Sequence, residues 1–122
     1  MNNHRDLEVW QLAKDLAADI YQVTKKFPKE ELFGLTDQIK RSTTSISANI
    51  AEGAGRNSSK EFLNFLSIAN GSSLELDTFL VISYEAKILS KEEFEKLEEK
   101  NNRIQKMNRG LQKSIRNRFN LK

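Results

Sequence analysis

Apolar residues recur at three- and four-residue spacing in four stretches of this 122-residue chain, as they do along one face of an amphipathic helix. The first stretch covers residues 7–27, with Trp10 and Ile20 on its apolar face. Pro28 disfavours helical backbone at the residue before it, so the helix should end there. We predict a helix over about 7–27, with Asp6 as its N-cap.

The second stretch covers residues 35–54 and follows a turn that contains Gly34. Gly53 and Gly55 stand near its end, where a C-cap favours glycine. The core positions on this helix are predicted to be Leu35, Ile39, Ile46 and Ile50.

Two capping boxes mark the starts of the remaining helices. Ser58 is followed three residues later by Glu61, and Ser90 is followed in the same way by Glu93. In such a box each side chain accepts a hydrogen bond from a backbone N–H that would otherwise lack a partner. The two helices that these boxes predict cover residues 59–89 and 91–119.

Short turns between long helices force neighbouring helices to run in opposite directions. The chain contains one proline and five glycines, too few for a β-rich fold or for long linkers. Its length suits one hydrophobic core. The sequence therefore predicts an all-α protein, in which residues 1–122 form a single antiparallel up-down-up-down four-helix bundle.

The helix predicted over 59–89 carries more apolar surface than one bundle needs. Its core face is predicted to consist of Phe62, Phe65, Leu66, Ala69, Leu76 and Leu80. A second apolar line, about 100° around the helix axis, consists of Leu63, Leu74, Val81 and Ile88. A helix that is apolar almost all round is usually buried all round, so we expect this line to contact another subunit. The alternative is that the N-terminal segment or the 28–34 turn covers it.

Small and polar residues line the second helix and continue into the third at 70–73. If Asn49, Glu52, Ser73 and Glu75 converged, they would form a ligand site. Buried polar groups normally need partners, however, and small residues let two helices approach closely. We favour the interpretation that these residues join the second helix to the third.

The inventory of reactive residues argues against an enzyme. The chain has no cysteine, and its one histidine, His4, lies near the N-terminus. Thiolate chemistry is therefore excluded, and Ser-His-Asp triads, zinc-protease motifs and paired Glu-x-x-His motifs lack the histidines that they require. We predict no catalytic residue, no metal and no cofactor.

Charge is segregated along the last predicted helix. Residues 91–99 contain five glutamates, whereas residues 100–122 contain eight Lys or Arg residues and no acid. The apolar line of this helix consists of Phe94, Leu97, Ile104, Met107, Leu111, Ile115 and Phe119. Four cations lie about 160° from that line at 100° per residue, and we call them the basic stripe: Lys106, Arg109, Lys113 and Arg116. Further cations that extend the candidate surface are Arg103 on the same helix and Lys40, Arg41 and Arg56 on the second.

The basic stripe suits the phosphates of RNA or DNA, which Lys and Arg neutralise. It is also typical of an ordinary solvated face, and of a helix whose acidic start and basic end complement its dipole. Aromatic residues do not interleave with the cations, so base stacking is not indicated. Any binding by the stripe should be electrostatic and weakly selective for sequence.

The sequence gives no indication of a membrane protein. No stretch approaches the roughly 18 apolar residues that span a bilayer. The first residues lack the apolar core of a signal peptide. We expect a cytoplasmic protein with no membrane partner.

Three segments of the chain resemble the bacterial 23S rRNA intervening-sequence proteins, also called the S23 ribosomal protein family. They read DLEVWQLA, FPKEELFGLTDQIKRSTTSISANIAEGAGR and EFLNFLSIANGSSLELDTFL, and the pairing of SANIAEGAGR with GSSLEL is the most specific part. The resemblance implies a four-helix protomer, a ring-shaped homopentamer and no catalytic residues. A related accessory protein of diversity-generating retroelements associates with nucleic acid and reverse transcriptase, so the resemblance implies nucleic acid or such an enzyme as a partner. The chain departs from the family pattern at Ser47, often proline, and at Ala54, often larger.

Two functions are the main candidates at this point, and an enzyme that uses buried carboxylates ranks third. The leading hypothesis is a non-enzymatic homo-oligomer that binds RNA or DNA through the basic stripe. The alternative is an adaptor that binds a protein partner, for example a nucleic-acid enzyme, and has no nucleic-acid role of its own.

Overall fold

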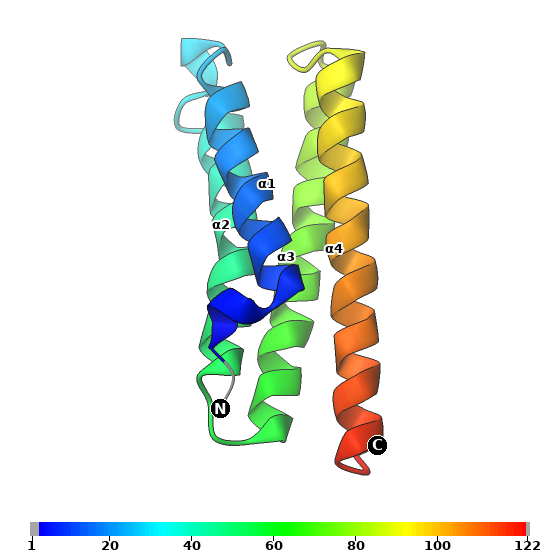
Figure 1. The fold of residues 1–122 in the computed structure, drawn as a ribbon. Coiled ribbons are helices and arrows are strands. Elements are labelled where there is room, and N and C mark those ends of the chain that lie inside the picture. Colours follow the sequence, from blue (N-terminus) through cyan, green and yellow to red (C-terminus); the bar gives the residue numbers. More distant parts are fainter. Residues whose placement is uncertain (1–2, 122) are drawn as a thin grey trace.

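The computed structural model describes residues 3–121, which form four α-helices and two short 3-10 helices (Figure 1). No strand occurs within that part of the chain. The prediction of an all-α protein with four helices is therefore confirmed. The elements in chain order are η1 (His4–Asp6), α1 (Glu8–Thr24), η2 (Lys29–Glu31), α2 (Leu35–Ala54), α3 (Ser59–Glu85) and α4 (Lys91–Arg118).

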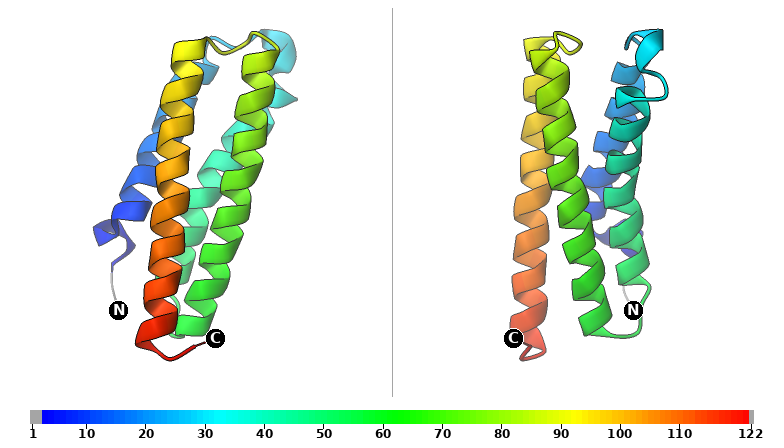
Figure 2. Two further views of the ribbon diagram at one scale, coloured as in Figure 1. Left: turned by 90° about the vertical axis from the view of Figure 1, so that its right-hand side faces the viewer. Right: turned by 180° about the vertical axis from the view of Figure 1, so that it is seen from behind.

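Each helix packs against two others, and the four stand side by side in the order α1, α2, α3, α4 and back to α1 (Figures 1 and 2). The helices α2 and α4 therefore lie on one diagonal and α1 and α3 on the other. Contacts between neighbours join residues in reverse order. On α4, Asn101 binds Ser73 and the later Asn108 binds the earlier Leu66 of α3.

The core contains buried residues from all four helices. On α1 the buried apolar residues include Val9, Ala13 and Leu16 beside the expected Ile20. Trp10 is only partly buried and packs against the edge of the core. The predicted core isoleucines of α2 and the central leucines of α3 are fully buried: Ile39, Ile46, Ile50, Leu66, Leu76 and Leu80.

Both ends of α1 differ from the prediction. Asp6 lies in η1, and the N-cap of α1 is Leu7, whose side chain makes no capping hydrogen bond. The helix ends at Thr24, and residues 25–27 form a turn before Pro28 rather than a last helical turn. The helix therefore ends three residues earlier than the effect of Pro28 on its immediate neighbour predicts.

The helix α3 ends at Glu85, four residues before the predicted end, and the cause is a left-handed residue. Lys87 has a φ of 64°. The N–H groups of Lys87 and Ile88 donate to the carbonyls of Tyr84 and Ser83, at 3.0 and 2.8 Å. This is the Schellman pattern of helix termination, which usually has glycine at the left-handed position. Because Lys87 occupies that position, the sequence does not predict the end of the helix.

One of the two predicted capping boxes is complete. The Ser90 Oγ accepts from the N–H of Glu93 at 3.0 Å, and the Glu93 carboxylate accepts from the N–H of Ser90 at 3.1 Å. Ser58 caps α3 in the same way at 3.3 Å, but the Glu61 carboxylate pairs with Arg56 instead of returning to Ser58. The second box is therefore only half formed.

The helices α2 and α3 approach closely, and Gly53 shows why. A Cβ atom at this position would lie 2.7 Å from the Cβ of Phe65, closer than two such atoms can come. Gly53 is therefore a buried packing residue rather than the predicted C-cap, which is Gly55. Further along the same seam, the hydroxyls of Ser45 and Ser72 form a 2.9 Å hydrogen bond.

By length and composition alone, α3 is apolar enough to cross a membrane, contrary to the expectation from sequence. In the bundle, however, this helix turns one side toward its neighbours. The buried side includes the polar residues Ser73 and Ser83 as well as leucines. The helix has the composition of a membrane span because apolar residues also occupy part of its outward side.

Candidate nucleic-acid interface

The basic stripe lies on the outward side of the second half of α4. All four cations of the stripe are exposed, because the opposite side of the helix is held in the core by its buried apolar residues, Leu97, Ile104 and Ile115. Within residues 3–121, no carboxylate lies within ion-pair distance of any of the four cations. Their charges are therefore directed to solvent and not used inside the protomer.

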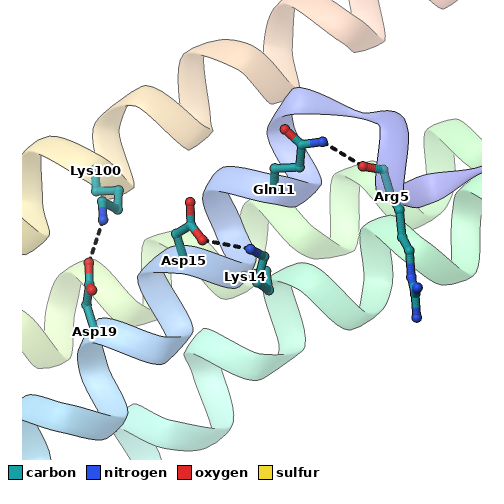
Figure 3. Close-up of polar contacts among 6 residues, drawn as sticks. All are labelled: Arg5, Gln11, Lys14, Asp15, Asp19 and Lys100. Carbon is teal, nitrogen blue, oxygen red and sulfur yellow. Dashed lines mark hydrogen bonds and ion pairs between the residues drawn. The ribbon is translucent and has the colours of Figure 1, made fainter.

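The first half of α4 is acidic on the same outward side. Glu92, Glu95 and Glu99 are exposed there. Some lysines near this end are paired: Lys100 pairs with Asp19 of α1 (Figure 3) and Lys96 with Glu92 of α4, while Lys26, in the turn after α1, pairs with Glu93. The exposed surface of α4 consequently changes sign along its length, from negative to positive.

Arg103 lies where the charge changes sign. It is exposed and lines a shallow surface hollow with Glu95, Glu99 and Lys106. Arg103 thus borders the stripe on one side and carboxylates on the other. We expect it to contribute less to an anion-binding surface than the four stripe residues.

The cations of α2 do not join the stripe within one protomer, because α2 and α4 lie on a diagonal of the bundle. The Lys40 ammonium lies 4.8 Å from the centre of the Tyr21 ring. The Arg41 Nε donates to Asp37 at 2.9 Å. Arg56 lies at the end of the bundle where α2 joins α3, beside Glu52 and Glu61.

Polar contacts of α1 keep the N-terminal segment in place. The Gln11 side chain donates to the carbonyl of Arg5 at 2.7 Å, and Lys14 pairs with Asp15 at 2.8 Å (Figure 3). The one histidine, His4, packs edge-on against the Trp10 ring at 4.9 Å. This explains why the segment before α1 follows a defined path.

Two carboxylates meet between α3 and α4. The Glu98 Oε2 is shielded from solvent, and no N–H or hydroxyl group of the described residues donates to it. Burial raises the pKa of Glu98 to about 7, helped by a proton shared with Asp77 and by repulsion from the Asp77 charge. By contrast, hydrogen bonds from Lys26 and from the backbone of Ser90 lower the pKa of Glu93.

Comparison with known protein families places this arrangement in context. Residues 5–110 match the model of the 23S rRNA-intervening sequence protein family, which is most of the chain. The chain belongs to this family. The suspected resemblance is confirmed by that match.

A solved structure has the same fold as this member of the 23S rRNA-intervening sequence protein family. It is a protein of unknown function from the S23 ribosomal protein family of Bacteroides thetaiotaomicron. The two chains are 28% identical, with a TM-score of 0.80 over 86% of this chain and 95% of the other. No curated protein matches the sequence.

The four polar residues considered as a ligand site do not converge in this family member. Asn49 donates to the carbonyl of Ser45 within α2 at 2.8 Å, and Ser73 donates to Asn101 at 2.6 Å. Glu52 pairs with Arg56, and Glu75 is exposed. None of the four side chains joins α2 to α3 by a hydrogen bond, since the bond of Ser73 pairs α3 with α4. The favoured interpretation is therefore wrong for these four residues, although Ser45 and Ser72 do join the two helices.

Sequence reasoning missed two buried asparagines on α4. The Asn101 amide donates to the Ser73 carbonyl at 3.0 Å, and the Asn108 amide donates to the Leu66 carbonyl at 2.9 Å. Gln105 adds a bond to the Ser73 hydroxyl at 2.9 Å. Both asparagines lie three or four residues from apolar positions of α4, so their spacing in the sequence could have predicted that they are buried.

The second apolar line of α3 is divided between the core and solvent. Leu63 and Ile88 are partly buried and pack against the core, and Val81 is also partly buried. Leu74 is 53% exposed. Two neighbours outside the predicted line are similarly open: Ile68 is 45% exposed and Ile82 is 47% exposed. We call these three the exposed apolar residues of α3: Ile68, Leu74 and Ile82.

Within residues 3–121, no group of three His, Cys, Asp or Glu side chains is arranged to hold a metal ion. The hollows along the first half of α4 are shallow and lined by charged side chains such as Glu92, Glu95 and Lys96. The surface feature with the clearest chemistry on α4 is therefore the basic stripe.

Proposed function

We propose that this family member is a non-enzymatic oligomer that binds RNA through the basic stripe of α4. The observation that carries the proposal is the set of four exposed cations on one helix face, none of them paired with a carboxylate of the described chain. Unpaired cations on a rigid helix can neutralise successive phosphates without first giving up internal ion pairs.

The choice of RNA over other polyanions draws on the family, whose name refers to intervening sequences in 23S rRNA. The stripe supports contacts to the phosphate backbone, which position a nucleic acid but carry little sequence information. The residues between its cations are not aromatic. Binding by the stripe is accordingly electrostatic, sensitive to salt and weakly selective for sequence.

The proposed protomer is an antiparallel up-down-up-down bundle, supported by the reverse order of the contacts between its helices. The proposed oligomer forms through the outward side of α3, supported by the exposed Ile68, Leu74 and Ile82. Resemblance to the family suggests five subunits. Several stripes on one particle would raise the avidity for a long RNA.

Fluorescence anisotropy with a labelled single-stranded RNA at low salt tests the proposal. The variant with Lys113→Glu and Arg116→Glu should bind at least about tenfold more weakly, because two contacts to phosphate become repulsive. The matched control carries Lys91→Glu and Lys96→Glu on the exposed, acidic half of the same helix. It has the same change of net charge and should lose much less affinity.

Absence of RNA binding by the folded wild-type protein at low salt would contradict the proposal. Equal losses in the two double variants would contradict it as well, since net charge and not the stripe would then govern binding.

The exposed apolar residues of α3 favour one alternative, a protein-binding adaptor. Apolar patches of this kind often mark protein interfaces. Capture of a specific partner that survives nuclease treatment and is lost in Leu74→Glu, but not in the stripe variant, would favour this function.

A further inference from the structure

A cavity opens at the end of the bundle where α2 joins α3 and α4 ends. Its volume is about 330 Å³. It exists because α1 begins only at Glu8, whereas α4 continues to Arg118 and α3 begins nearby at Ser59 (Figure 1). The last turns of α4 and the first turn of α3 thus lack a fourth helix beside them.

The floor of this cavity is apolar and belongs to the core. Phe62 and Leu111 are partly buried and pack against the core cluster, and Ile115 is buried. Phe119, predicted to lie on the apolar line of α4, is instead 53% exposed at the rim. The opening therefore offers flat aromatic and aliphatic surface to a ligand.

The rim of the cavity is cationic. Arg56, in the turn after α2, and Arg118, at the end of α4, line the cavity. Serines such as Ser59 and Ser114 also line it. Among residues 3–121, no Asp or Glu side chain lines the cavity itself. In contrast, hollows along the first half of α4 are lined by several glutamates. The charge at this end suits an anion.

Both arginines are available to an incoming anion. Arg56 pairs with Glu52 and Glu61 at 3.4 and 3.7 Å, but all three side chains are more than two-fifths exposed, and such pairs are weak. Its guanidinium is kept in position by the Phe65 ring, 4.9 Å away. The Arg118 guanidinium lies 5.8 Å from the Phe119 ring.

We propose that this cavity binds one nucleotide. The base lies on the apolar floor near Phe62 and Phe119, and the 5′-phosphate is held by Arg56 and Arg118. Cavities of a few hundred Å³ suit ligands of this size. Aromatic and guanidinium planes favour a flat ring, and arginine binds phosphate with two parallel hydrogen bonds. The ligand is either a free nucleoside monophosphate or the phosphorylated end of an RNA strand.

This site is separate from the basic stripe. The cavity lies on the side of α4 that faces the bundle, whereas the stripe lies on the outward side. The inference therefore goes beyond the proposed function, and either one can fail without the other.

Isothermal titration of the full chain with adenosine 5′-monophosphate tests the proposal. Binding in the millimolar range or tighter is expected, with adenosine and inorganic phosphate each at least about tenfold weaker because each uses half of the site. The variant Arg118→Gln should weaken binding about tenfold. Ser114→Trp should block the cavity without removing a charge.

The matched control is Lys113→Gln, which removes one charge from the stripe near the cavity. It should leave the affinity for adenosine 5′-monophosphate unchanged. Circular dichroism establishes that each variant remains helical. No binding to the folded wild type, equal losses in Lys113→Gln and Arg118→Gln, or phosphate binding as tight as the nucleotide would each overturn the proposal.

A second titration separates the two sources of the ligand. If the source is a strand end, a short 5′-phosphorylated RNA competes with adenosine 5′-monophosphate and its 5′-hydroxyl counterpart does not. If neither RNA competes while the mononucleotide binds, the ligand is a free nucleotide. Both results support a nucleotide site in the cavity.

Discussion

At the scale of single residues, Glu98 is a side chain whose charged form is destabilised by its surroundings in the folded protein. One of its carboxylate oxygens is buried, no N–H or hydroxyl group of the described residues donates to it, and the ionisable group that raises its pKa is another acid, Asp77. A proton shared between the two carboxyl groups relieves both problems. The folded state therefore holds a proton that the unfolded chain has already released near neutral pH.

The variant Glu98→Gln should be more stable than the wild type at pH 8. The pKa of Glu98 rises from 4.5 to about 7 on folding, so the folded chain binds more protons between these values. Its contribution to stability consequently falls as pH rises through this window. The gain at pH 8 should be about 1 kcal/mol, reduced from the full shift because much of the side chain is exposed.

Urea unfolding at pH 4.5 and pH 8 measures this difference. The gain should be present at pH 8 and nearly absent at pH 4.5. Glu95→Gln, at an exposed position of the same helix, serves as the control and should show little change. An equal effect of Glu98→Gln at both pH values would show that the shared proton is not the cause.

Gly53 is constrained by steric packing and not by charge. The variant Gly53→Ala should be destabilised by roughly 1–3 kcal/mol, because the new methyl group would overlap Phe65 and force α2 and α3 apart. Gly110→Ala is the matched control, since a Cβ there meets nothing within 4 Å. It should stabilise α4 by about 0.5–1 kcal/mol. Thermal unfolding that ranks the two variants in the reverse order would contradict this packing.

At the scale of helices, starts were easier to predict than ends. Ser58 and Ser90 identify the starts of α3 and α4 because an N-cap uses a side chain that can be read from the sequence. The end of α3 depends on the backbone of Lys87, and α4 ends in the same way with Asn120 at a φ of 55°. Lysine rarely adopts this conformation, so the end of α3 carries no signal in the sequence, whereas asparagine favours it and gives a weak signal at the end of α4.

The candidate site could likewise be predicted only where its features are visible in the residue types and their spacing. The stripe could be predicted because charge and helical spacing are both visible in the sequence. The separation of Lys40 and Arg41 from the stripe could not, because it depends on which helices share a diagonal. The cavity beside Arg56 and Arg118 also escaped prediction, since it results from the relative lengths of α1 and α4.

The pairing of α3 with α4 should depend on the hydrogen bonds of Asn101. Asn101→Ala removes two bonds to Ser73 and leaves a small cavity at a fully buried position, so a loss of about 2–4 kcal/mol is expected. A double-mutant cycle with Ser73→Ala, followed by urea unfolding, should give a coupling of about 1 kcal/mol. Additive losses would mean that the bond between the two side chains contributes nothing.

At the scale of the whole molecule, the outward side of α3 is the feature that an isolated bundle explains least well. Its apolar residues give the helix the composition of a membrane span, although the opposite side packs in the bundle. Contact with further copies would bury them.

The wild-type protein should therefore sediment as an oligomer at micromolar concentration. Leu74→Glu should shift it toward the monomer while its helices remain folded, because a charge replaces an apolar contact. Gln22→Glu, at an exposed position of α1, adds one carboxylate elsewhere and should leave the oligomer intact. A monomeric wild type would contradict self-association, and indifference to Leu74→Glu would exclude this side of α3 as the contact.

The proposed function depends on whether the basic stripe binds phosphates. The most direct measurement is the affinity of the wild type for single-stranded RNA over a series of salt concentrations. Four neutralised phosphates predict that the logarithm of the binding constant falls with the logarithm of salt with a slope of about −3. The variant with Lys113→Glu and Arg116→Glu should show a clearly smaller slope. A wild-type slope near zero, or the same slope in both proteins, would contradict the account.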